Sequence, residues 1–192
     1  MGGTVKLIVL DRDGSLGQIS EDFVRSPDEW RPQPGALEAV ARLNQGGWRV
    51  VVASNQSGLG RGLFDMATLN AVHARMHKLL AAAGARVDAV FVCPHAPEDG
   101  CNCRKPEPGL LLQIGQRYGV NLAEVPAVGD SLSDVRAAAA AGCMPHLLLC
   151  GQLSDHADSV AGALPLPPLP EGTRVHANLA AFADVLLATD KV

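Results

Sequence analysis

Uniformly apolar runs alternate along this chain with segments of helical hydrophobic spacing, which indicates short strands interleaved with amphipathic helices. Uniformly apolar runs, typical of buried strands, lie at Val5–Leu10, Arg49–Ala53, Val87–Val92, Ala127–Val128 and His146–Leu149. Helical spacing covers Ala36–Asn44, Asp65–Ala83, Gly109–Tyr118, Ser133–Ala141 and roughly Asn178–Ala188. This alternation predicts an α/β fold of the Rossmann-like kind, a parallel sheet with helices on both faces.

The length and charge of the chain narrow the classes of function. At 192 residues it is long enough for one domain with a real core, and the net charge of −4 argues against a broad basic face for nucleic acid. No apolar run approaches the ~18 residues of a membrane span, and the apolar start is too short for a signal peptide. We expect one domain over residues 1–192 that acts as a cytoplasmic monomer on a small molecule, without nucleic acid or membrane partners.

Polar clusters follow each of the first four predicted strands at the point where the strand ends. They are "DRDG" at Asp11–Gly14, "SNQSG" at Ser54–Gly58, a cysteine-rich loop ending in Arg104 and Lys105, and "GDSLSD" at Gly129–Asp134. In parallel sheets ligands sit at the carboxyl ends of the strands. We therefore expect all four clusters to meet at one edge of the sheet.

The residues in these clusters suit phosphoryl transfer. Carboxylates that lie close together repel one another and call for a cation, and Mg²⁺ prefers such oxygen ligands. Ser54 and the backbone amides after it can hold phosphate oxygens, and Lys105 supplies a positive charge. An aspartate nucleophile would complete the set. The four carboxylates expected to meet are Asp11, Asp13, Asp130 and Asp134.

Each cluster alone also has a purely structural interpretation. A D-x-D pair after a strand can cap a helix or hold a metal in a sugar transferase. "SNQSG" can be an ordinary turn with a helix N-cap, and "GDSLSD" can simply cap a helix that begins near Ser133. The order of all four on successive strands favours the joint, catalytic interpretation.

The loop 93–103 carries four residues that bind soft or borderline metals. Cys93, His95, Cys101 and Cys103 form a closed tetrahedral set for Zn²⁺, with no position left for water, so the predicted role is structural. Free thiols or an oxidised pair are the alternative. Because the cations of residues 104 and 105 follow the last ligand directly, we expect zinc to order them over the substrate.

The motifs "DRDGS", "SNQSG", "RKP" and "GDSLSD" resemble the signature motifs of the haloacid dehalogenase-like phosphatases, over roughly residues 5–150. Within that superfamily, "NQSGLGRG" and the Cys-x-His…Cys-x-Cys loop are similar to those of the D-glycero-D-manno-heptose 1,7-bisphosphate 7-phosphatase family. The related histidinol-phosphatases share the metal loop, but tend to have an acidic residue where this chain has Ser57.

This resemblance implies Mg²⁺-dependent removal of the 7-phosphate of a heptose bisphosphate, in the synthesis of lipopolysaccharide heptose precursors. One alternative is the same chemistry on histidinol phosphate or another small phosphomonoester. An alternative of another class is a non-catalytic, zinc-stabilised binding module.

The resemblance also implies roles for individual residues. Asp11 would attack phosphorus and become the aspartyl phosphate, and Asp13 would act first as acid and then as base. Mg²⁺ would be held by the side chains of Asp11 and Asp130 and by the main-chain carbonyl of Asp13. The transferring phosphoryl group would be bound by three residues of the second motif: Ser54, Asn55 and Gln56.

In the same comparison, Lys105 would stabilise the phosphoryl group and Arg104 would take the second phosphate of the substrate. Asp134 would orient Lys105 or a metal-bound water, and Ser131 occupies the position after Asp130, where some relatives have lysine. In the loop 15–33, Gly17 lies where an asparagine is common in the family.

Several segments are predicted to be structural. The gaps after the first and third strands are too short for a separate cap domain, so we expect an open site. "LPLPPLP", Leu164–Pro170, reads as a stiff proline-rich strap. His73 and His77 are expected to be solvated, and Cys143 and Cys150 to be packing residues. Two aromatic residues of the loop 15–33 either cover the substrate or pack against the domain: Phe23 and Trp30.

Overall fold

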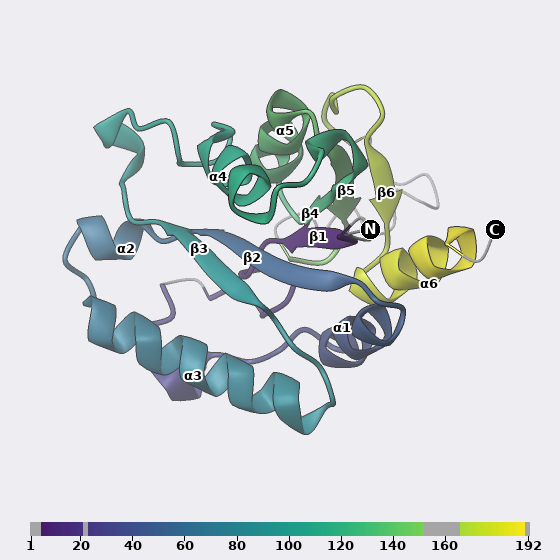
Figure 1. Ribbon diagram of the computed structural model, residues 1–192. Helices are drawn as coiled ribbons and strands as arrows, with labels where there is room; N and C mark the ends of the chain where they lie inside the picture. Colours follow the sequence, from purple (N-terminus) through teal and green to yellow (C-terminus); the bar gives the residue numbers. More distant parts are fainter. Residues whose placement is uncertain (1–4, 21–22, 152–165, 191–192) are drawn as a thin grey trace.

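The computed structural model describes residues 5–20, 23–151 and 166–190. In that part of the chain six strands form one parallel sheet in the order β3-β2-β1-β4-β5-β6 (Figure 1). The order changes direction at β1, where ligands bind in open α/β sheets. The strands are β1 (Leu7–Leu10), β2 (Arg49–Asn55), β3 (Ala89–Cys93), β4 (Pro126–Gly129), β5 (Met144–Leu148) and β6 (Arg174–His176).

The predicted Rossmann-like α/β fold is confirmed, and its five predicted strands all appear. The strand that the sequence did not predict is β6, in which a single apolar residue, Val175, stands between polar neighbours. It pairs in parallel with β5, with Arg174 opposite His146. Pairing with a neighbouring strand, not its own hydrophobic pattern, makes this segment a strand.

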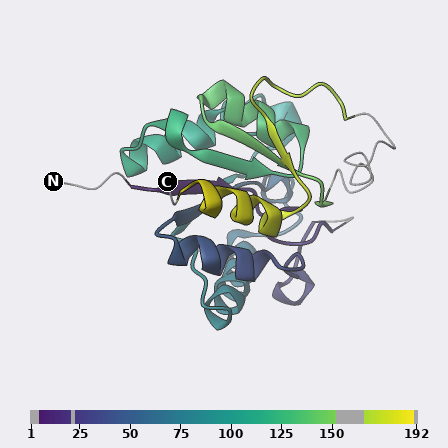
Figure 2. The same cartoon turned by 90° about the vertical axis from the view of Figure 1, so that its right-hand side faces the viewer.

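Helices pack on both faces of the sheet. They are α1 (Ala36–Gln45), α2 (Ser57–Gly60), α3 (Met66–Ala82), α4 (Gly109–Tyr118), α5 (Leu132–Ala141) and α6 (Leu179–Thr189). Helices α1, α3 and α6 lie on one face, and α4 and α5 on the other (Figures 1 and 2). The short α2 was not predicted, because its sequence "SGLG" has no apolar period. None of the helices in the described ranges has the length and apolar character that crossing a membrane requires.

Two buried apolar clusters hold the layers together. One joins α1, α3 and α6 to the sheet and includes Trp30 and Phe182, both fully buried. The other joins α4 and α5 to the opposite face, around Leu110 and Ile114. Trp30 therefore packs in the core and does not cover a substrate. Burial of a side chain of this kind contributes roughly 1.5–3 kcal/mol.

Two buried histidines lie where β5, β6 and α6 meet. The Nδ1 atom of His146 is 2.9 Å from the Nε2 atom of His176, and both rings meet the ring of Phe182 edge-on. Burial lowers the pKa of both histidines, that of His146 to about 3, helped by the neighbouring ring and by Arg174. The pair is therefore neutral in the folded protein at neutral pH.

The predicted proline-rich strap lies partly outside the described residues, because Leu164 and Pro165 are not described. The described part of the strap begins at Leu166. Leu166 and Leu169 pack against a small buried cluster that contains Val135 and Leu147. In this part the strap covers apolar surface beside α5 and β5.

Candidate active site

The carboxyl ends of β1, β2 and β4 meet at one edge of the sheet, as the order of the motifs predicts. A hollow of about 90 Å³ opens there. Most of the predicted phosphate- and magnesium-binding residues line it. The lining residues are Asp11, Asp13, Ser54, Asn55, Lys105, Asp130, Ser131, Ser133 and Asp134.

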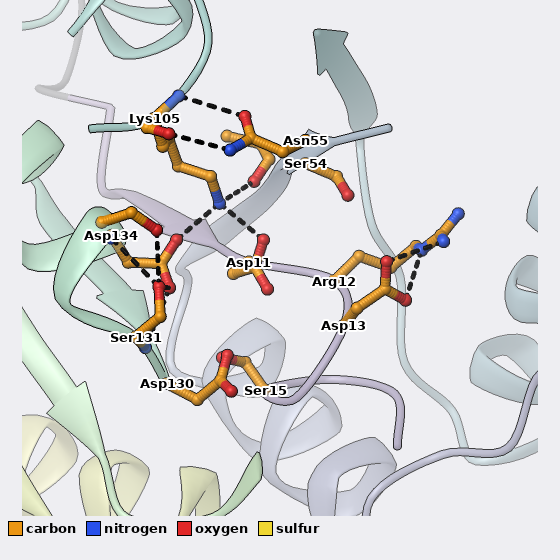
Figure 3. Close-up of polar contacts among 12 residues, drawn as sticks. Asp11, Arg12, Asp13, Ser15, Ser54, Asn55, Lys105, Asp130, Ser131 and Asp134 are labelled. Carbon is orange, nitrogen blue, oxygen red and sulfur yellow. Dashed lines mark hydrogen bonds and ion pairs between the residues drawn. The ribbon is translucent and has the colours of Figure 1, made fainter. Parts of the chain in front are cut away.

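Lys105 is the centre of this cluster and is almost fully buried. Its Nζ atom lies 2.5 Å from Oδ1 of Asp11, 2.6 Å from Oδ1 of Asp134 and 2.8 Å from the main-chain oxygen of Ala53 (Figure 3). These contacts engage all three hydrogens of the ammonium group. Lys105 therefore provides a fixed positive charge in contact with the carboxylate of Asp11, the predicted nucleophile.

Burial and charge act in opposite directions on these groups. Burial lowers the pKa of Lys105, but the charges of Asp11 and Asp134 outweigh it and raise the pKa above its ordinary value. Burial raises the pKa of Asp11 well above its usual range, Lys105 opposes this, and Asp134 and Asp130 add to it. A further positive charge nearby would favour the carboxylate form of Asp11.

The carboxylates fit a divalent cation. Oxygen atoms of Asp11, Asp130 and Asp134 all lie within 4.8 Å of one another. Three carboxylates and the single ammonium of Lys105 carry a formal charge of two negatives, which a divalent ion balances. Hard oxygen ligands of this kind suit Mg²⁺. Gly14 allows the close approach, since a Cβ there would lie 2.1 Å from Oδ2 of Asp130.

Asp134 is engaged on both of its oxygens. Oδ1 meets Lys105, and Oδ2 accepts hydrogen bonds from the main-chain N and the Oγ of Ser131, at 3.1 and 2.6 Å. Ser131 is the N-cap of α5 and accepts in turn from the amide of Asp134. The capping interpretation of "GDSLSD" thus holds, and the same cap aims Asp134 at Lys105.

The carboxylate of Asp13 lies apart from the other three. Nε and Nη2 of Arg12 donate to its two oxygens, each at 2.8 Å, and Nε2 of Gln56 donates at 2.9 Å. In Figure 3 the group points toward Arg12 and away from Asp11. The four carboxylates line the same hollow, as expected, but that of Asp13 pairs with Arg12 and is not among the three whose oxygens lie within 4.8 Å of one another. Burial of Arg12 could not be predicted from the local sequence.

The side chains of the second motif bind the protein itself. Asn55 brackets the main chain of Lys105: it donates to its oxygen at 3.0 Å and accepts from its nitrogen at 3.1 Å. Gln56 donates to Oγ of Ser54 at 2.7 Å as well as to Asp13. Both amides thus position other members of the site. The phosphate contacts expected of Ser54, Asn55 and Gln56 stay predictions.

The four predicted zinc ligands converge. Their sulfur and nitrogen atoms lie 3.3 to 3.7 Å apart in five pairs, and all within 4.8 Å. A tetrahedral ion with Zn–S bonds of about 2.3 Å separates its sulfurs by about 3.8 Å, close to these distances, so the donor set fits zinc. Two cysteines lie outside this donor set, and burial raises the pKa of their thiols, to about 12 for Cys143 and about 11 for Cys150. The four donors are Cys93, His95, Cys101 and Cys103.

Arg104 lies beside the hollow that Asp11 and Lys105 line. Its Nη1 atom donates to the main-chain oxygen of His95 at 3.3 Å, which ties it to the cysteine-rich loop. It also lines a second hollow of about 380 Å³, which shares Lys105 with the first. The sequence expectation of a second phosphate site at Arg104 has room in this hollow.

In the loop after β1, the side chain of Trp30 occupies the space that a side chain at position 17 would need. A Cβ on Gly17 would lie 2.6 Å from Nε1 of Trp30, closer than any real contact of that kind. Among the described residues, this Nε1 is the buried side-chain nitrogen without a hydrogen-bond partner. Phe23 packs against Phe64 at 6.3 Å between ring centres. The asparagine common in the family at position 17 does not fit here.

Comparison with known proteins agrees with this geometry. The model of the family "haloacid dehalogenase-like hydrolase" matches residues 6–142. The D-glycero-beta-D-manno-heptose-1,7-bisphosphate 7-phosphatase of Bordetella bronchiseptica is 57% identical over 95% of this chain and 98% of its own length. The protein of that name from Pseudomonas aeruginosa is 48% identical over 94% and 97%.

A solved structure supports the same assignment. The D,D-heptose 1,7-bisphosphate phosphatase from B. bronchiseptica, complexed with magnesium and phosphate, superposes with a TM-score of 0.88. It is 57% identical and covers 96% of this chain and 99% of its own. The protein therefore belongs to the haloacid dehalogenase-like hydrolases, and within them to the D-glycero-D-manno-heptose-1,7-bisphosphate 7-phosphatase family.

Proposed function

We propose that this protein is a Mg²⁺-dependent phosphatase that removes the 7-phosphate of D-glycero-D-manno-heptose 1,7-bisphosphate through an aspartyl phosphate. The observation that carries the proposal is Lys105, held between Asp11 and Asp134 beside Ser54 and Asp130. A non-catalytic, zinc-stabilised module would not need this buried charge cluster. Membership of a hydrolase family also argues against such a module.

In the first half-reaction an oxygen of Asp11 bonds to the phosphorus atom of the 7-phosphate. The bond between phosphorus and the sugar oxygen breaks, and its electron pair stays on that oxygen, which takes a proton from the carboxyl group of Asp13. In the second half-reaction Asp13 takes a proton from water, whose oxygen bonds to phosphorus. The bond to Asp11 then breaks, and phosphate is released.

The proposed metal ligands are the side chains of Asp11 and Asp130 and the main-chain carbonyl of Asp13. When bound, Mg²⁺ supplies positive charge where the phosphate meets the carboxylates. Without that charge, two unit charges about 4 Å apart repel each other by roughly 4 kcal/mol at an effective dielectric of 20. Lys105 contributes a second, permanent charge, with Asp134 fixing its direction.

The zinc loop would present the substrate-binding cations. We place structural Zn²⁺ on Cys93, His95, Cys101 and Cys103, which leaves no open ligand position. Arg104, tied to the main chain of His95, would then contact the second phosphate of a bisphosphate. The hollow at Arg104 beside the catalytic one supports a substrate with two phosphates over a monophosphate.

The proposal extends to the setting of the reaction. The product would feed the synthesis of lipopolysaccharide heptose precursors, in the cytoplasm, and the enzyme would act as a monomer of one domain. A reducing compartment suits the chain, since all five cysteines are unpaired and four donors form the zinc set.

A phosphate-release screen tests the proposal. The purified protein with Mg²⁺ is offered both anomers of the heptose bisphosphate, histidinol phosphate and generic sugar monophosphates. We expect kcat/KM to be at least about tenfold higher on the heptose bisphosphate than on the monophosphates, since Arg104 binds its distal phosphate.

Asp11→Asn is the control, and it should release no phosphate and form no phosphoenzyme. Highest kcat/KM on histidinol phosphate would refute the substrate assignment but leave the chemistry. Unimpaired turnover by Asp11→Asn would refute the mechanism itself.

A further inference from the structure

His73, on the α3 helix, contacts the arginine that holds the acid/base residue. Its Nε2 atom lies 3.2 Å from Nη1 of Arg12, and the other edge of the same guanidinium binds both oxygens of Asp13. The sequence favoured a solvated pair of histidines on this helix. Only His77 is exposed, whereas His73 is partly buried, so that expectation is wrong for His73.

The direction of this hydrogen bond follows from the chemistry of the two groups. Arginine can only donate, so Nε2 of His73 accepts and the ring proton is on Nδ1. Burial, and then the charge of Arg12, lower the pKa of His73 to about 4. The imidazole is therefore neutral at the pH at which such an enzyme works, and its acceptor stays available.

We propose that His73 is a positioning residue for the phosphatase reaction: it fixes Arg12, and through Arg12 the direction of the Asp13 carboxyl group. The inference rests on the proposed function in one respect, the role of Asp13 as acid and base. Arg12 is 1% exposed, and its planar fork is held from two sides. Without the acceptor on His73, one buried N–H loses its partner and the fork is free to turn, carrying Asp13 with it.

Gln56 shows why the direction of Asp13 matters. Its Nε2 atom donates both to Oδ2 of Asp13 and to Oγ of Ser54, the predicted phosphate contact. The carboxyl group thus stands next to the phosphate position, where it can reach the leaving oxygen. A turn of the Arg12 fork would pull it from that place without touching Asp11 or Lys105.

A displaced acid has a characteristic kinetic effect. The proton from Asp13 matters most where the leaving oxygen is basic, because a poor leaving group cannot depart as an anion. p-Nitrophenolate leaves readily without a proton, whereas phenolate does not. Moreover, kcat/KM reports only the steps up to loss of the leaving group. Displacement of Asp13 therefore lowers kcat/KM for phenyl phosphate much more than for p-nitrophenyl phosphate.

Two substitutions separate the acceptor of His73 from its bulk. His73→Phe keeps a ring of similar size but removes the acceptor, and His73→Gln removes the ring but keeps an acceptor oxygen. His77→Gln, four residues along the same helix and exposed, is the matched control. Thermal unfolding first checks that each variant folds. If His73→Phe does not fold, His73→Leu takes its place.

We expect His73→Phe to lose about tenfold in kcat/KM on phenyl phosphate, part of the roughly 100- to 10,000-fold that acid–base catalysis contributes. On p-nitrophenyl phosphate the loss should stay below about twofold, and His73→Gln and His77→Gln should behave as the unaltered protein does. An equal loss on both esters, no loss, a gain, or a defect in His73→Gln alone would overturn the inference.

Asp13→Asn distinguishes this inference from the proposed function. It should show the same preference for the better leaving group, only stronger. If Asp13→Asn loses equally on both esters, the proposed role of Asp13 fails. If it discriminates and His73→Phe does not, only the role of His73 fails. Neither outcome depends on which sugar is the substrate.

Discussion

Lys105 shows how much a single side chain can do in this fold. It is 6% exposed and pairs with two buried carboxylates, of Asp11 and Asp134, while its backbone is held by Asn55. Buried ion pairs seldom stabilise a fold relative to apolar residues, but removing one partner leaves uncompensated charge. The lysine thus ties the stability of the site to its chemistry.

Lys105→Met should lower the free energy of unfolding by about 3–5 kcal/mol in Mg²⁺-free buffer, because two buried carboxylates lose their counter-charge. Urea unfolding measures the change. Arg42→Met is the control, since the pair of Arg42 with Asp184 is exposed and should contribute less than about 1 kcal/mol. Equal, small losses in both variants would mean that the cluster is not charged in the folded protein.

At the residue scale the sequence predicted which side chains gather, but not how each one points. Asp11, Lys105 and Asp130 could be predicted because each follows a strand end, and strand ends meet by topology. The turn of Asp13 toward Arg12 could not, since it depends on burial of Arg12 under α3. Contacts between side chains from distant parts of the chain leave no periodic signal.

Among the elements, the cysteine-rich loop connects β3 to α4 and carries Lys105 at its end. Its 3-10 turn, Pro97–Asp99, is capped by Asp99, which accepts from the amide of Ala96 at 2.8 Å. Gly109, at the start of α4, donates to the oxygen of Asn102 at 2.9 Å. The proposed zinc site would hold this irregular segment where few apolar side chains can.

Cys103→Ala should release zinc and lower kcat/KM on the bisphosphate by about tenfold or more, because Arg104 and Lys105 lose their support. Metal analysis and phosphate release measure the two effects. Cys143→Ala, which removes a buried thiol outside the loop, should keep its zinc. Full activity in zinc-free Cys103→Ala would contradict the ordering role.

Helices and strands with a hydrophobic period in their own sequence were predicted well, and those without such a period were not. The helix Gly109–Tyr118 has the predicted bounds, and α5 begins one residue earlier than expected because Ser131 caps it. The short α2 and β6 were missed. Each is stabilised by its neighbours in the fold, which local sequence does not reveal.

For the molecule as a whole, the buried histidines of β5 and β6 couple stability to acidity. The unfolded chain binds protons on histidine near pH 6.5, but the folded chain holds His146 neutral, with its pKa lowered to about 3 by burial and then by His176 and Arg174. The unfolded state therefore binds more protons below pH 6.5. The contribution to stability is complete above that pH and is lost as the pH falls toward 3.

His146→Gln should therefore weaken the acid sensitivity of the fold. Between pH 6 and 5, its free energy of unfolding should fall by roughly 1 kcal/mol less than that of the unaltered protein. Denaturant unfolding at the two pH values measures this, and exposed His77→Gln should leave the slope unchanged. Loss of zinc in acid affects all three proteins alike. A slope in His146→Gln equal to that of the unaltered protein would refute the assignment.

The indole of Trp30 fills the volume that a side chain at position 17 would need. These two sites thus cannot diverge independently during evolution. A homologue that acquires asparagine at position 17 must have a smaller residue at position 30 or a shifted backbone at one of the two positions. Homologous sequences should therefore show covariation between positions 17 and 30.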